Sequence, residues 1–156
     1  MIFDDTLEIA DATTVALAAG TTVLGDVIDL GQVALQDIGN GDELFLVINV
    51  DTAILAATAG TIQFTVVSDA LSTLGGGVVA NCTTHAVSPS IATAAAAAGL
   101  ARAGQTILVV ALPYGSYEQY LGILVTVATA ATTQGKVNAF LTRDAAKWVA
   151  TADAIN

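Results

Sequence analysis

Apolar and polar residues alternate with a period of two along much of this chain. In residues 43–51, Leu44, Leu46, Ile48 and Val50 all fall on one face of an extended segment. The same alternation recurs over residues 61–67, 120–129 and 137–141, and residues 21–30 form a further candidate. Residues 107–112 are continuously apolar, as in a strand that is covered on both faces. These patterns predict at least six β-strands.

Turn-forming residues separate the predicted strands. They are rich in glycine and lie at Gly31 and at positions 39–42, 75–77, 113–115 and 134–135. Short strands separated by such regularly spaced turns are typical of a β-sandwich or barrel. The sequence does not show the helices that alternate with strands in a parallel-sheet protein. We therefore predict a single all-β domain over residues 1–156, with an N-terminal arm over about residues 1–20 and a C-terminal tail over about residues 145–156.

One segment departs from the strand pattern. Residues 91–103 contain five consecutive alanines, and alanine is the best helix former. Gly99 and Gly104 flank the alanines, so the small residues could equally form a loop packed on the sheet. A short helix and a crossing loop both remain open here.

The charge is strongly acidic and unevenly distributed. The formal net charge is −10, and the four basic residues, Arg102, Lys136, Arg143 and Lys147, all follow position 101. Three of the 14 acidic residues follow that position, which leaves 11 before it. A protein that binds DNA or RNA needs a basic face to neutralise phosphates. The charge therefore argues against nucleic acid and anionic lipid as partners.

The high apolar content, 54% of residues, raises the question of a membrane span. The longest uncharged stretch, residues 70–101, is interrupted by polar residues and by Pro89, whereas a spanning helix needs about 20 mostly apolar residues. Asp4, Asp5 and Glu8 stand where a signal peptide would have a basic leader and an apolar core. We expect a soluble protein made in the cytoplasm.

Candidate catalytic residues are few. His85 is the only histidine and Cys82 the only cysteine, and no nucleophile motif such as G-x-S-x-G accompanies them. Catalytic Cys/His pairs are normally assembled from distant segments, so a separation of three residues means little. We interpret His85 as a polar residue of a loop or sheet edge and Cys82 as a small packing residue. The chain is expected not to be an enzyme and to use no cofactor.

Acidic residues offer an alternative, a cation site. Residues 37–43 come closest to a calcium loop, but they lack the full pattern, and Asn-Gly turn chemistry explains them better. Asp26 and Asp29 could form a carboxylate pair, which nothing else supports. The three glycines at 75–77 precede neither Lys-Ser/Thr nor a helix, so they predict no phosphate loop. No metal ligand is predicted.

The aromatic residues lie at turns and near the ends. Tyrosines and tryptophans are enriched at the energetic centres of protein interfaces, although they could equally be lids on a core. We take them, with their neighbours, as candidate interface residues: Ile2, Phe3, Tyr114, Tyr117, Tyr120, Lys147 and Trp148.

Several short motifs occur in a recognisable order. They are VIDLG at 27–31, DIG at 37–39 leading into the strand at 44–50, then residues 60–69, LP at 112–113, YLG at 120–122 and the closing strand at 135–141. This order resembles the jelly-roll capsid cement (decoration) proteins of tailed bacteriophages, of the kind first seen on a Bordetella phage. The Ala-rich segment 91–103 and the tail with Lys147 and Trp148 depart from that pattern.

The resemblance implies a structural protein of the virion with no catalytic residues. Such a protein sits on the outer surface of the phage head, binds the major capsid protein and stabilises contacts between neighbouring capsid subunits. The resemblance favours a homodimer, with a homotrimer as the alternative. Two other functions stay open: a carbohydrate-binding or adhesin-like jelly roll, and another virion component of the head–tail region or the tail.

Overall fold

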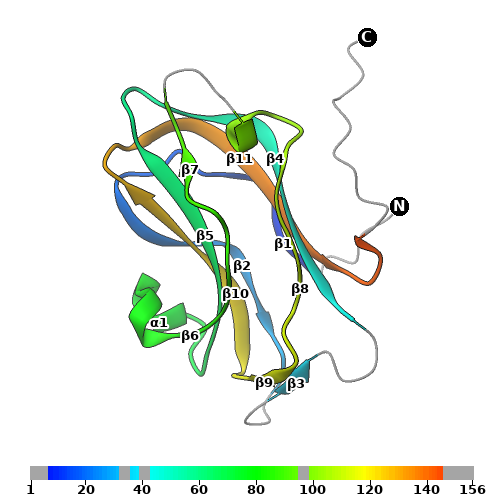
Figure 1. The fold of residues 1–156 in the computed structure, drawn as a ribbon. Coiled ribbons are helices and arrows are strands. Elements are labelled where there is room, and N and C mark those ends of the chain that lie inside the picture. The colour runs from blue at the N-terminus through cyan, green and yellow to red at the C-terminus, as the bar shows by residue number, and fades with distance from the viewer. Residues whose placement is uncertain (1–6, 32–35, 39–42, 95–98, 146–156) are drawn as a thin grey trace.

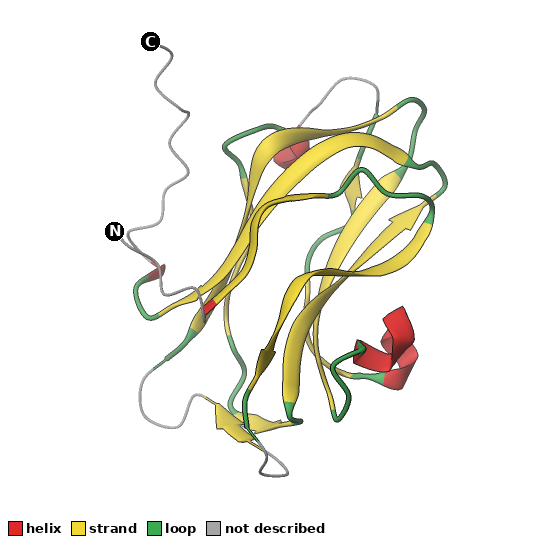
Figure 2. Ribbon diagram, turned by 180° about the vertical axis from the view of Figure 1, so that it is seen from behind, coloured by secondary structure: helices red, strands yellow, loops and turns green. Residues whose placement is uncertain are grey.

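The computed structural model describes residues 7–31, 36–38, 43–94 and 99–145 (Figure 1). Most of these residues lie in antiparallel strands that form two facing sheets, as the view from behind also shows (Figure 2). Sheet A has the strand order β1 (Glu8–Thr14), β11 (Thr132–Thr142), β4 (Phe45–Ala56), β8 (Thr106–Ala111). Sheet B has the order β2 (Gly20–Asp29), β10 (Tyr120–Ala128), β5 (Thr61–Asp69), β6 (Thr83–Val87), and β7 (Ile91–Ala92) also pairs with β5. The short strands β3 (Gln36–Ile38) and β9 (Gly115–Tyr117) form a separate ribbon at one end of the sandwich.

The order of the eight main strands is that of a jelly roll. Taken along the chain, β1, β4, β8 and β11 build sheet A, and β2, β5, β6 and β10 build sheet B. The first and last of these strands, β1 and β11, are neighbours, as are β2 and β10. This nesting of outer strands around inner ones is how a double-sheet jelly roll is wound. The predicted fold class is confirmed.

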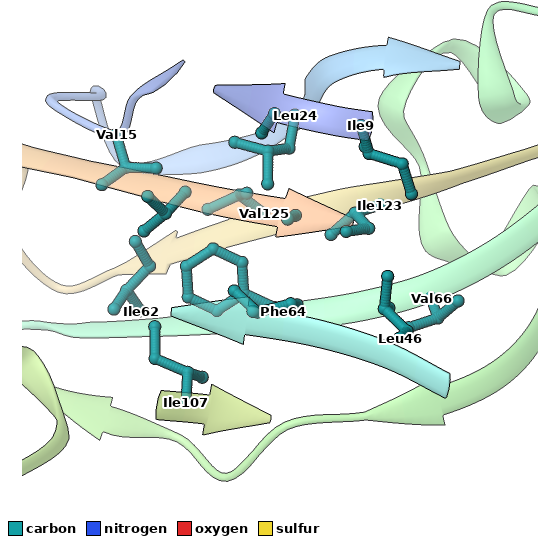
Figure 3. Close-up of a cluster of buried hydrophobic side chains, with 14 of the residues drawn as sticks. Ile9, Val15, Leu24, Leu46, Ile62, Phe64, Val66, Ile107, Ile123 and Val125 are labelled. Atoms are coloured by element: carbon teal, nitrogen blue, oxygen red, sulfur yellow. The ribbon is translucent and has the colours of Figure 1, made fainter. Parts of the chain in front are cut away.

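The core fills the space between the two sheets (Figure 3). Phe64 of β5 lies at its centre with no exposed surface, and Ile62, Ile107 and Val125 surround it. The inward residues are nearly all Val, Ile and Leu, which fit a pleated surface and fill the gap between sheets closely. The alternation seen in the sequence is thus the alternation between this core and the outer faces.

The six predicted strands are present, but the N-terminal arm is shorter than predicted. Residues 8–14 of the segment assigned to the arm form β1, which pairs with β11 and places Ile9 and Ala10 in the core. The sequence pattern did not predict this strand, because β1 carries two acidic residues and its alternation is broken at two register shifts. Residues 1–6 and residues 146–156 of the predicted tail lie outside the described part of the chain.

The described parts of the Ala-rich segment do not form an α-helix. Ile91 and Ala92 form β7, where Ile91 is buried opposite Ile62, and Gly99–Ala101 form a 3₁₀ turn, η3. Pairing with β5 overrides the helix propensity at the start of this segment, and residues 95–98 lie outside the described range. The helical turns α1 (Leu74–Gly77) and η2 (Val79–Asn81) occur elsewhere. No helix in the described residues is both long and apolar enough to cross a membrane.

Candidate functional site

A small cap covers part of the outer face of sheet B. It consists of residues 70–82, which include α1 and η2, and it lies outside the sandwich beside β5, β6 and β10 (Figure 1). Leu74 of the cap is fully buried against Val67 and Leu124, which face away from the main core. The cap therefore protects a second, smaller apolar cluster.

The cap turns in the left-handed sense. Leu74, Gly75, Gly76 and Gly77 all have positive φ angles, between 45° and 79°. Glycine adopts this conformation without steric cost, whereas an L-residue such as leucine does not. The triple glycine thus forms a turn, as its sequence predicts, and the burial of Leu74 offsets the strain at its own backbone.

Gly122 of β10 makes the space into which Leu74 inserts. A Cβ atom at Gly122 would lie 2.6 Å from Cδ1 of Leu74. The cap is also tied to the sheet because Asp69 Oδ2 accepts a hydrogen bond from the Gly75 N–H. Asn81 Nδ2 donates to the Gly75 carbonyl oxygen over 3.2 Å.

The only histidine lies in a polar cluster at one edge of sheet B. His85 of β6 has Nε2 2.8 Å from Oγ of Ser68 of β5, and its ring stacks on Tyr117 with ring centroids 3.9 Å apart. The Ser68 hydroxyl also accepts the Glu118 N–H over 3.2 Å, and the Tyr117 hydroxyl donates to the Pro113 carbonyl over 2.8 Å. These contacts connect β5, β6 and the segment between β9 and β10.

The electrostatics of this cluster favour neutral side chains. Burial lowers the pKa of His85, and the opposing effect of Glu118 is smaller. Burial likewise raises the pKa of Tyr117. Because Ser68 Oγ already accepts from Glu118, its single proton is available for the neutral His85 ring. The Ser68 hydroxyl can therefore donate to Nε2 of the neutral ring while it accepts from Glu118.

A Ser–His hydrogen bond is also the first requirement of a nucleophile and its base. However, the Ser68 side chain has no exposed surface, so Oγ is out of reach of a substrate in this structure. Burial, with smaller effects of Asp69 and Glu118, raises the pKa of the Cys82 thiol, which disfavours the reactive thiolate. The contacts of this cluster link β5, β6 and the connection between β9 and β10. Sequence reasoning did not find Ser68, because it lies 17 residues from its partner His85.

The acidic residues do not gather into a cation site in the described part of the chain. No group of three or more His, Cys, Asp or Glu side chains there is arranged to hold a metal ion. Asp29 instead accepts hydrogen bonds from the Gly31 N–H at 2.9 Å and from Gln119 Nε2 at 3.3 Å. Residues 39–42 of the predicted loop lie outside the described residues.

The three tyrosines have different surroundings. Tyr117 is fully buried, Tyr120 is partly buried against the small cluster under the cap, and Tyr114 is 74% exposed. They do not form an exposed aromatic platform of the kind expected for a carbohydrate-binding jelly roll. Tyr114 is therefore the candidate interface residue that the structure leaves accessible. Ile2, Phe3, Lys147 and Trp148 lie outside the described residues.

A protein-family model named Bbp16 matches residues 9–141. The chain belongs to the Bbp16 family. The match runs from β1 to β11 and so includes both sheets, the cap and the His85 cluster. The family name points to a Bordetella phage protein, which agrees with a structural protein of a phage. No curated protein sequence matches the chain.

The Bbp16 match also separates the candidate interface residues into two groups. The three tyrosines lie within it, whereas Ile2, Phe3, Lys147 and Trp148 lie outside residues 9–141. Other large apolar side chains on the surface of the Bbp16 domain are exposed by 45 to 65%: Leu71, Val78, Val87 and Val109. Leu71 and Val78 belong to the cap, Val87 to β6 and Val109 to β8. These side chains and Tyr114 are the accessible apolar contacts that the family domain offers to a partner.

Proposed function

We propose that this chain is a capsid decoration, or cement, protein that binds the outer surface of a phage head and links neighbouring major capsid subunits. The observation that carries the proposal is the Bbp16 match across a complete jelly roll. A protein that links subunits must transmit force without deforming. A two-sheet sandwich suits that task. Each of its eight main strands is hydrogen-bonded within a sheet, and the first strand, β1, is paired with the last, β11.

We further propose that the role is not enzymatic and that protein contacts perform it. Ser68 has no exposed surface, and burial raises the pKa of the Cys82 thiol, which disfavours the thiolate that covalent chemistry would need. Tyr114, in contrast, is exposed in the loop between β8 and β9, and tyrosine buries a large apolar area while keeping a polar hydroxyl. We place a contact with the shell at Tyr114.

The test is to add purified protein to phage heads that lack it and to count bound copies. Saturation at a number that matches the symmetry sites of the shell, together with slower release of DNA on heating, is the expected result. Heads that bind nothing at saturating protein concentration would rule out the proposal. Binding to tails or to head–tail connectors, with none to heads, would assign the chain to a different part of the virion.

A matched pair of variants tests the position of the contact. Tyr114→Ala should weaken binding to heads while leaving the unfolding midpoint unchanged, because the side chain contributes little to the core. Leu71→Ala removes a comparably exposed apolar side chain from the cap and should bind as the wild type does. The reverse outcome would place the shell contact on the cap.

A further inference from the structure

His85 is the extra residue of a β-bulge in the edge strand β6. Its two neighbours, Thr84 and Ala86, lie opposite the consecutive residues Val67 and Val66 of β5, so His85 has no opposite residue of its own. A bulge of this kind interrupts the ladder and redirects the side chain of the unpaired residue. The His85 ring can therefore change its position without breaking the pairing of β5 with β6.

The ring of His85 lies against the segment that carries the exposed Tyr114. We call residues 113–117 the Tyr114 segment. The Tyr117 hydroxyl closes this segment by donating to the Pro113 carbonyl over 2.8 Å. The Tyr117 ring, on which His85 stacks, has no exposed surface, whereas Tyr114 is 74% exposed. His85 thus restrains the buried end of the segment whose other part faces solvent.

The hydrogen bonds of Ser68 suit a neutral His85. Ser68 Oγ accepts the Glu118 N–H over 3.2 Å and lies 2.8 Å from Nε2 of His85. With a neutral ring, the single hydroxyl proton of Ser68 can satisfy Nε2. When the ring is protonated, Nε2 becomes a donor, and the hydroxyl proton loses its acceptor. Since Ser68 has no exposed surface, water does not replace that acceptor, and an unsatisfied buried donor should weaken the closed arrangement by about fivefold or more.

The ionisable groups around His85 come from four neighbouring segments. Glu118, just before β10, favours the protonated ring, but burial has the larger effect and lowers the pKa of His85. Asp69 ends β5, and its carboxylate accepts an N–H of the cap. Burial raises the pKa of Tyr117 on β9 and of Cys82 at the end of the cap, so both side chains are uncharged in mildly acidic solution. The surroundings therefore favour the neutral ring while the cluster is closed.

We propose that His85 is a pH-sensitive latch. In its neutral form it holds the Tyr114 segment against sheet B, and its protonation releases the ring from Ser68 and loosens that segment. The inference goes beyond the proposed function, because it describes a property of the free chain. It rests on the proposed function in one consequence only, that a loosened segment would weaken a shell contact made by Tyr114.

Amide hydrogen exchange of the free chain, measured by NMR at pH 7.5 and 5.5, tests the latch. The reporter is the Glu118 N–H, whose acceptor is Ser68 Oγ. After correction for the intrinsic effect of pH on exchange, its protection should fall about fivefold at pH 5.5, as expected for one lost buried hydrogen bond. Low concentrations of urea should speed the exchange of Val125 in the middle of β10, which needs global unfolding, and leave that of Glu118 unchanged.

Two variants separate the latch from a general effect of acid. His85→Gln keeps a polar side chain that can accept from Ser68 but does not titrate, so the loss of Glu118 protection at pH 5.5 should disappear. The matched control, Glu118→Gln, keeps the reporter N–H and an oxygen that can accept from the Thr83 hydroxyl. Because it removes the charge that favours the protonated ring, the loss of protection should remain and its midpoint should move to lower pH.

Equal protection of the Glu118 N–H at the two pH values in the wild type overturns the inference. A loss that persists in His85→Gln also overturns it, as does a Glu118 N–H whose exchange depends on urea as that of Val125 does. Circular dichroism establishes that each variant is folded, and if His85→Gln is not, an unmoved midpoint in Glu118→Gln decides against the latch. Since no phage heads are present, these results are independent of whether the chain decorates capsids.

Discussion

The insertion of Leu74 above Gly122 predicts a strong energetic coupling between two residues 48 positions apart. Gly122→Ala adds a Cβ that would lie 2.6 Å from Leu74 Cδ1, and its other near contact, Val27 Cγ2 at 3.5 Å, is an ordinary one. Leu74 must therefore move to admit the methyl group. Overpacking of this kind costs about 1–3 kcal/mol, and we expect about 1–2 kcal/mol because the obstructing atom is the end of a flexible side chain.

Leu74→Ala has the opposite effect on packing, because it leaves a cavity above Gly122 where the leucine side chain was. Replacing a buried leucine by alanine costs roughly 2–5 kcal/mol, and we expect about 2–3 kcal/mol here because the cap can settle onto the sheet. In this background the alanine at position 122 no longer meets Leu74. It should then be neutral, or stabilising by about 0.5–1 kcal/mol, because alanine restricts the unfolded chain more than glycine does.

A double-mutant cycle measured by urea denaturation tests this reasoning. The four proteins should unfold with similar m-values, so that shifts in midpoint report stability directly. The double variant should be more stable than the sum of the two single effects by about 1–3 kcal/mol, as found for residues that share a cavity. Additivity within about 0.5 kcal/mol would show that Leu74 does not occupy the space above Gly122.

Two further predictions concern the His85 cluster. Because burial holds the pKa of His85 below its ordinary value of 6.5, the unfolded chain binds a proton before the folded one as pH falls. The contribution of His85 to the free energy of unfolding should thus be constant well above pH 6.5 and should decrease as the pH falls below 6.5. Urea midpoints at pH 7.5 and 5.5 should differ for the wild type and much less for His85→Gln, and since the chain has one histidine, equal slopes for both proteins would refute the assignment. Tyr117→Phe removes the hydrogen bond to the Pro113 carbonyl and should cost about 0.5–1.5 kcal/mol, with the ring packing retained; an unchanged midpoint would mean that water replaces the hydroxyl.

The strands that could be predicted are those whose inward residues alternate without interruption. β4, β5 and β10 each present Val, Ile, Leu or Phe to the core at three or more successive alternate positions, so the sequence alone locates them. β6 has no such alternation, because it holds His85 in a polar cluster and is only partly covered. The Ala-rich segment was open to two interpretations because alanine favours a helix in isolation, while Ile91 gains more by burial opposite Ile62.

The contacts of the candidate site could not be predicted for a different reason. Ser68, His85 and Tyr117 come from three segments that meet only once β5, β6 and the β9–β10 connection are in place. The same holds for Leu74 and Gly122, since a glycine in a strand signals a close approach without naming the residue that approaches. The three glycines at 75–77 did predict a turn, because the positive φ angles that glycine adopts depend on the residue itself and not on distant contacts.

The pairing of β1 with β11 has a mechanical consequence. The two strands are antiparallel, so Glu8, at the start of β1, lies opposite Phe140, near the end of β11. A pull applied between the two ends of the domain would load these cross-strand bonds one at a time, as a zipper opens, rather than all together. A pull along the strands from opposite ends of the sandwich would load a whole ladder at once. The domain should thus unfold at low force when it is stretched by its two chain ends. It should resist a much higher force when the load is applied to the surfaces of its sheets. A protein that binds its partners by those surfaces would carry its load in this second way.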